Sequence, residues 1–174
     1  MEQFLYKQLE ALPPGWTPGW APGKLLIWAE TDSDATWASW AVFTGFNYKG
    51  GLESIREEIH VFRSSFVARL IPYPSPSSLS AGKGYTPEGW SYRPLHANRF
   101  EFGCEGGDGV SQPERCSCIL RYEEYIIVFD TPIADYMTLE DLQRIMEVID
   151  REMTDYLKHS TLRPGPRLVL MAIP

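Results

Sequence analysis

The four side chains best suited to bind a metal ion are His96, Cys104, Cys116 and Cys118. Imidazole and thiolate groups are the ligands that zinc prefers, and a hairpin could bring these four together. However, Cys116 and Cys118 lie two residues apart and would share one face of a strand, whereas zinc sites usually draw paired ligands from a tight turn. We therefore expect three reduced cysteines that pack as small apolar side chains. A zinc site and a Cys104–Cys116 disulfide are the alternatives.

Other catalytic arrangements have weaker support in the sequence. A cysteine nucleophile needs a histidine close by, and nothing in the sequence brings His60, His96 or His159 to a cysteine. Asp130 ends an apolar run, a place where many enzymes hold a metal-binding aspartate, but an aspartate that caps the following turn fits equally well. We predict no catalytic residue and no cofactor other than a possible zinc ion.

Aromatic side chains gather in two segments rich in proline and glycine. Trp16 and Trp20 each follow a Pro-Gly pair, and their rings could form a platform for a ligand or seal the core. We expect them to seal the core, since large aromatic rings are buried more often than displayed. Residues 72–96 form the long loop, whose second half should pack on the body or on a ligand. The aromatic candidates for partner binding are Trp16, Trp20, Tyr85, Trp90 and Tyr92.

Negative charge is concentrated late in the chain. The net charge is −7, and residues 123–155 hold ten acids against two arginines. Such an excess repels phosphates, so a nucleic-acid partner is not expected. The acids indicate either a solvated helix face or a docking surface for a protein with a basic or apolar surface, with Glu147, Asp150 and Asp155 as candidates.

The compartment is inferred from what the sequence lacks. No apolar stretch is long enough to cross a bilayer, and residues 1–12 do not resemble a signal peptide. Three cysteines do not form a typical secreted disulfide framework. We expect a cytoplasmic protein without a membrane partner.

Periodicity predicts the order of elements along the chain. We expect a short helix over residues 2–12, a hairpin over 24–30 and 36–46, a helix over 52–62 and a strand over 65–71. Residues 59–62 would also suit an extended chain. Three antiparallel strands should follow over 98–104, 116–122 and 125–130. A long helix should begin after Thr138 and end near His159, and residues 168–173 could add a strand.

These elements predict an α+β fold in a single domain, residues 1–174: a mostly antiparallel sheet with the long C-terminal helix packed on one face. The leading functional hypothesis is a non-enzymatic protein-interaction module, an accessory or inhibitory subunit that docks through the acidic C-terminal third and the aromatic loops. The first alternative is a small-molecule-binding protein with an aromatic-lined pocket. The second is an enzyme that uses Asp130, His96 or the cysteines.

Overall fold

The computed structural model describes residues 11–14, 16–18, 35–46, 52–62, 64–70 and 84–159. Residues 2–10 of the first expected helix and the strands expected over 24–30 and 168–173 lie outside these ranges, as do Trp20 and residues 72–83. The described elements, in chain order, are β1 (Thr17–Pro18), β2 (Ala35–Phe46), β3 (Leu52–Phe62), α2 (Ser65–Leu70), β4 (Arg99–Glu105), β5 (Arg115–Tyr122), β6 (Tyr125–Pro132) and α3 (Leu139–His159).

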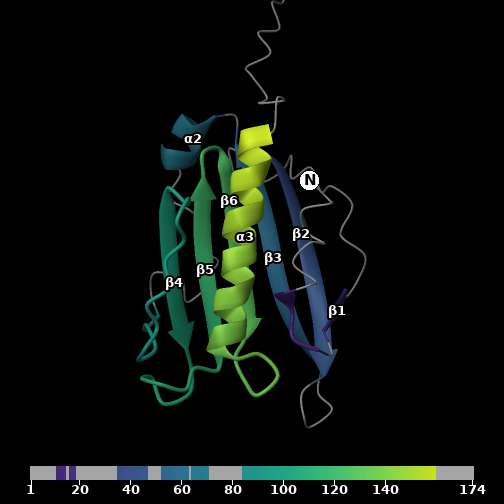
Figure 1. The fold of residues 1–174 in the computed structure, drawn as a ribbon, viewed down its shortest axis with the longest axis vertical. Helices are drawn as coiled ribbons and strands as arrows, with labels where there is room; N and C mark the ends of the chain where they lie inside the picture. Colours follow the sequence, from purple (N-terminus) through teal and green to yellow (C-terminus); the bar gives the residue numbers. More distant parts are fainter. Residues whose placement is uncertain are drawn as a thin grey trace, which may run out of the picture.

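The strands form one antiparallel sheet in the order β1-β2-β3-β6-β5-β4. The helix α3 lies along one face of this sheet, and α2 lies at one end of it (Figure 1). The predicted α+β fold, with an antiparallel sheet and a long C-terminal helix on one face, is confirmed.

The two faces of the sheet carry different hydrophobic clusters. On the face that α3 covers, Ile127 and Phe129 of β6 belong to one buried cluster with Ile145 and Ile149 of the helix. On the opposite face, alternate residues of the same strands pack with α2 in a smaller cluster. Its buried members are Phe62, Ala68, Ile119, Ile126 and Val128. We call these the helix-covered face and the opposite face.

The prediction of a helix over residues 52–62 is wrong, because this segment is the strand β3. It pairs with β2 on one side and with β6 on the other. Ile55, Ile59 and Val61 are buried in the cluster under α3, with the two-residue alternation of a strand. Glu57 occupies the intervening position of that face and is also buried, so a charged residue interrupts the apolar alternation. The apolar residues that remain have helical spacing, and pairing with two neighbouring strands decides the conformation.

The strand expected over residues 65–71 is also wrong, since residues 65–70 form α2. Ser64 begins this helix: its hydroxyl oxygen accepts a hydrogen bond from the amide of Val67 at 3.2 Å. Its carbonyl oxygen accepts one from the amide of Ala68 at 3.0 Å. This is the arrangement of a serine N-cap, and it begins a short helix in a segment that was expected to be extended.

The three later strands and the long helix are where the sequence predicted them. Glu123 adopts a positive φ of 52° in the tight turn between β5 and β6. At the start of α3, the Thr138 hydroxyl accepts a hydrogen bond from the Asp141 amide at 3.1 Å, and the Asp141 carboxylate accepts one from the Thr138 amide at 3.0 Å. This reciprocal pair is a capping box, with aspartate in the place of glutamate, and it fixes where the helix begins.

Candidate functional site

The segment before β4 is fastened to α3 by one buried carboxylate. Asp150 of α3 accepts hydrogen bonds from the amides of Leu95 at 3.0 Å and His96 at 3.3 Å. It also accepts a bond from the Tyr122 hydroxyl of β5 at 2.8 Å. A buried aspartate needs such partners to offset its lost hydration. Asp150 therefore joins loop, helix and sheet, and it holds residues 95 and 96 at a fixed place on the helix.

The surroundings of Asp150 keep the neighbouring tyrosines protonated. Burial, followed by the charge of Asp150, raises the pKa of Tyr122 far above its usual value. The pKa of Tyr92 is raised as well, first by burial and then by Asp150 and Glu147. Both phenols thus stay neutral at physiological pH, and Tyr122 remains a hydrogen-bond donor to the carboxylate.

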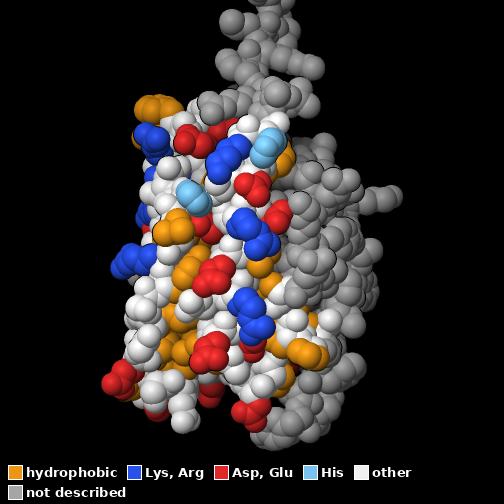
Figure 2. Space-filling view, viewed as in Figure 1, with side chains coloured by type: hydrophobic (Ala, Val, Ile, Leu, Met, Phe, Trp, Pro, Cys, Tyr) orange, Lys and Arg blue, Asp and Glu red, His pale blue; other side chains and the backbone are white. Residues whose placement is uncertain are grey.

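A groove of about 500 Å³ lies between this segment and α3. Figure 2 shows acidic and basic side chains alternating along the helix next to a strip of hydrophobic ones. The residues that line the groove are Tyr92, Arg93, Leu95, His96, Glu147, Asp150, Arg151, Thr154, Asp155 and Lys158. The three carboxylates are matched by two arginines and a lysine, so the groove is balanced in charge rather than acidic.

Leu95 is the most exposed large hydrophobic side chain of the described residues. Its exposed fraction is 88% although its own amide is held by Asp150. A backbone that is anchored and a side chain that points to solvent form a pre-positioned apolar contact, which costs little conformational entropy on binding.

Four aromatic rings pack together where the loop contacts β4. Trp90 stacks on Phe102 of β4 with ring centroids 4.4 Å apart, and Tyr92 meets Phe100 edge to face at 6.2 Å. Trp90 and Tyr92 are themselves 6.1 Å apart. All four are partly buried against the cluster under α3. The expectation that the second half of the long loop packs on the body is confirmed, and Trp90 and Tyr92 serve mainly to hold it there.

The other aromatic candidates have structural places. Trp16 is buried, and its indole Nε1–H donates to the carbonyl oxygen of Tyr136 at 3.1 Å. It seals the core, as expected, and is no exposed platform. Tyr85 exchanges two backbone hydrogen bonds with Cys104 at the outer edge of β4, and its hydroxyl donates to the carbonyl oxygen of Gly106. Neither side chain lines the groove.

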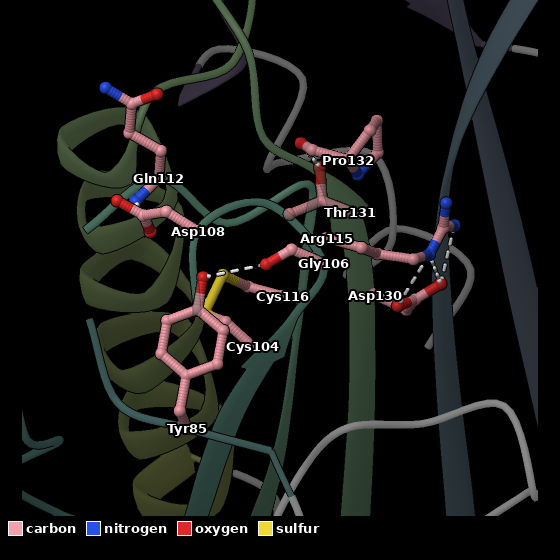
Figure 3. Close-up of a disulfide and its surroundings, with 10 residues drawn as sticks. All are labelled: Tyr85, Cys104, Gly106, Asp108, Gln112, Arg115, Cys116, Asp130, Thr131 and Pro132. Atoms are coloured by element: carbon pink, nitrogen blue, oxygen red, sulfur yellow. Dashed lines mark hydrogen bonds and ion pairs between the residues drawn. A yellow bond between two sulfur atoms is a disulfide. The ribbon is translucent and has the colours of Figure 1, made fainter. Parts of the chain in front are cut away.

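The expectation of three reduced cysteines is wrong, because Cys104 and Cys116 form a disulfide (Figure 3). The two residues are opposite each other in the β4–β5 register. The amide and carbonyl of Cys104 form hydrogen bonds with Tyr85, on the side of β4 away from β5. Cys104 and Cys116 are therefore a non-hydrogen-bonded pair of the β4–β5 ladder. In antiparallel sheets, the Cα atoms of such pairs lie closer together than those of hydrogen-bonded pairs. This short separation allows the two sulfur atoms to form a disulfide between neighbouring strands.

A zinc site on the four predicted ligands has no support in this geometry. Two of the sulfurs are bonded to each other, and Cys118 is buried with its sulfur 3.0 Å from that of Met146. Burial raises the pKa of the Cys118 thiol well above its usual value, and the charges of Asp130 and Glu57 add to this. Within the described ranges no three metal-ligating side chains are grouped to hold an ion.

The residues of the enzyme hypothesis are not brought together. The Asp130 carboxylate accepts bonds from Nε of Arg115 at 2.8 and 3.0 Å, on the opposite face of the sheet. The amide of His96 is held by α3, on the helix-covered face. The sheet therefore separates these two candidates.

Of the eight partner-binding candidates from sequence, four line the groove: Tyr92, Glu147, Asp150 and Asp155. His96, from the zinc set, lines it as well. The sequence prediction missed Arg93, Leu95, Arg151 and Lys158. The last two follow the acids of α3 at helical spacing, which was a usable signal. Leu95, which lies between Pro94 and His96 in a loop without periodicity, gave none.

Comparisons with known proteins add no assignment: no protein-family model matches the sequence, and neither a curated protein nor a solved structure is significantly similar to it. Among the helices in the described ranges, none has the length and hydrophobicity that crossing a bilayer requires.

Proposed function

We propose that the protein is a non-enzymatic interaction module that binds another protein through the groove between residues 92–96 and α3. The single observation that carries this proposal is the anchored, solvent-facing Leu95 at the edge of a groove of balanced charge. Protein interfaces typically combine a central apolar contact with a polar rim.

The groove favours a partner with an apolar patch bordered by both signs of charge. Arg93, Arg151 and Lys158 offer positive groups to partner carboxylates, while Glu147 and Asp155 offer negative ones. Several acids of the C-terminal third are engaged within the chain: Asp130 pairs with Arg115, Asp141 pairs with Arg144, and Asp150 is buried. Fewer acids are therefore free for docking than the composition suggested.

A small-molecule site is the second candidate, since the same groove has the volume of a ligand pocket. Its lining contains seven ionisable side chains besides Tyr92, more than the few polar groups that usually orient a small ligand, although most of the lining area is apolar. Of the aromatic rings that could line such a pocket, only Tyr92 does so, while Trp90 packs against Phe102 and Tyr92.

Site-specific crosslinking tests the proposal. A photoreactive phenylalanine analogue is placed at position 95 and, as the matched control, at position 110. Val110 is also an exposed apolar residue, with an exposed fraction of 56%, but it does not line the groove. In the native host we expect one discrete protein adduct from position 95 and none from position 110. Equal labelling from both positions, or no adduct from position 95, would contradict the proposal.

A further inference from the structure

Three arginines converge at the α2 end of the opposite face. Arg99 of β4 and Arg121 of β5 are register partners, so their side chains leave the same face of the sheet next to each other. Arg121 in turn pairs with Ile126 of β6. Ile126 packs in one cluster with Ala68 of α2, and this contact brings the adjacent Arg69 to the same place.

These charges are poorly compensated within the described part of the chain. Arg99 has an ion pair with Glu101, but neither Arg69 nor Arg121 has one there. The Nε atom of Arg121 is buried without a hydrogen-bond partner. The pKa of Arg121 is lowered, first by burial and then by Arg99 and Arg69, and Glu123 only partly opposes this.

Like charges directly opposite in a ladder are unfavourable, and a buried N–H group without an acceptor is rare. The repulsion between the arginines would be relieved by an anion that accepts hydrogen bonds from several guanidinium groups. A phosphate group fits best, because its oxygens match the planar fork of donors that arginine presents.

We propose that Arg69, Arg99 and Arg121 form a binding site for a phosphate group, on the face of the sheet that α3 does not cover. Arg121 is the central residue, since it neighbours both of the others. The site is separate from the groove and does not depend on the proposed docking function.

Two exposed apolar side chains next to this site bear on the source of the phosphate. Phe66 and Leu70 lie one helical turn apart on α2, with exposed fractions of 67% and 64%. Hydrophobic and basic side chains meet at the α2 end in Figure 2. Apolar side chains beside basic ones suit the phosphate of a lipid headgroup. A soluble phosphate would use the arginines alone.

The first test compares thermal unfolding of the whole chain in inorganic phosphate and in chloride at equal ionic strength. Phosphate should raise the unfolding temperature of the wild type, because a ligand that binds only the native state stabilises it. The variants Arg69→Gln and Arg121→Gln should lose this shift, with phosphate affinity at least about tenfold weaker for loss of one charge-assisted contact. Arg144→Gln, on α3, is the control and should keep the shift.

The second test uses phosphatidylcholine vesicles with and without phosphatidic acid in a sedimentation assay. A lipid source predicts binding only to the phosphatidic acid vesicles, its loss in Arg121→Gln, and its loss in the double variant Phe66→Ser, Leu70→Ser. A soluble source predicts the phosphate shift without vesicle binding. The proposal is overturned if the wild type responds in neither test, or if Arg121→Gln responds as the wild type does.

Discussion

At the scale of single residues, Asp150 organises the candidate site. It is a buried carboxylate whose three donors come from the loop and from β5, so that one side chain positions Leu95, His96 and Tyr122 together. The sequence indicated Asp150 only as one of several acids on a helix. Its role depends on which helix face meets the loop, and helical periodicity alone does not reveal that.

Replacement of Asp150 by alanine should destabilise the fold by about 3 kcal/mol, because it leaves two amides and a phenol without their acceptor. Urea unfolding measures this change. Asp155→Ala, on the exposed side of the same helix, is the control and should change the free energy of unfolding by no more than about 0.5 kcal/mol. In hydrogen exchange, the amides of Leu95 and His96 should lose protection in Asp150→Ala only. Equal effects of the two substitutions would contradict the anchoring role.

Tyr122 should make stability fall in alkaline solution. Its native pKa is raised above that of the unfolded chain, so its stabilising contribution is complete below the unfolded value of about 10 and is lost as the pH rises above it. Tyr122→Phe should reduce the slope of stability against pH above about pH 10 by up to ~1.4 kcal/mol per pH unit. Tyr92 and Tyr125, whose pKa values are also raised, leave a residual slope. Chemical denaturation at a series of pH values measures this, and an unchanged slope would argue against the protonated phenol.

At the scale of elements, the β4–β5 hairpin is closed by the disulfide and by a tightly bonded turn. Asp108 accepts hydrogen bonds from the amides of Val110, Ser111 and Gln112, and these bonds lower the pKa of its carboxyl group well below the usual range. Gly107 has a positive φ, and a Cβ atom at this position would lie 1.5 Å from the carbonyl oxygen of Gln112. The turn therefore requires glycine, and its geometry sets Cys104 opposite Cys116.

The denatured protein, never exposed to reductant, should release one free thiol per chain, that of Cys118, in a quantitative thiol assay, and three after reduction. The double variant Cys104→Ala, Cys116→Ala should lose about 2–4 kcal/mol of stability, because the unfolded chain gains loop entropy. Cys118→Ala keeps the crosslink and is the matched control. Three free thiols before reduction would contradict the paired hairpin.

The strands and the long helix could be predicted from sequence where local signals agree with the fold. The later strands carry apolar runs bounded by turn residues, and Thr138 with Asp141 marks the start of α3. The signals failed at β3, where a buried Glu57 breaks the alternation, and at α2, where Ser64 caps a short helix. At both places contacts distant in sequence, or a single cap, outweigh local propensity.

The disulfide shows a similar limit. The sequence allowed a Cys104–Cys116 bond across a hairpin, but the choice between thiols and a disulfide depends on register. A shift of one residue would place the two sulfurs on opposite faces of the sheet. Register in this hairpin is set by the turn at residues 106–109 and by burial under α3, and composition does not determine either.

At the scale of the whole molecule, both proposed binding sites lie on the surface. The larger hydrophobic cluster lies between the sheet and α3. The groove around Leu95 and the arginines near α2 are surface features that packing of this cluster does not require. The fold itself implies no activity, since an α+β architecture hosts many. The docking proposal therefore depends on the side chains of one groove, and substitution of its exposed side chain Leu95 should alter binding without altering folding.

The most direct test of the docking face is the affinity of three forms of the protein for the partner identified by crosslinking at position 95. Titration calorimetry compares the wild type, Leu95→Asp and Val110→Asp. A charge at the proposed apolar contact should weaken binding at least about tenfold, whereas Val110→Asp should bind as the wild type does. Equal thermal stability of the two variants would exclude misfolding as the cause. If Leu95→Asp binds as tightly as the wild type, the groove is not the docking face.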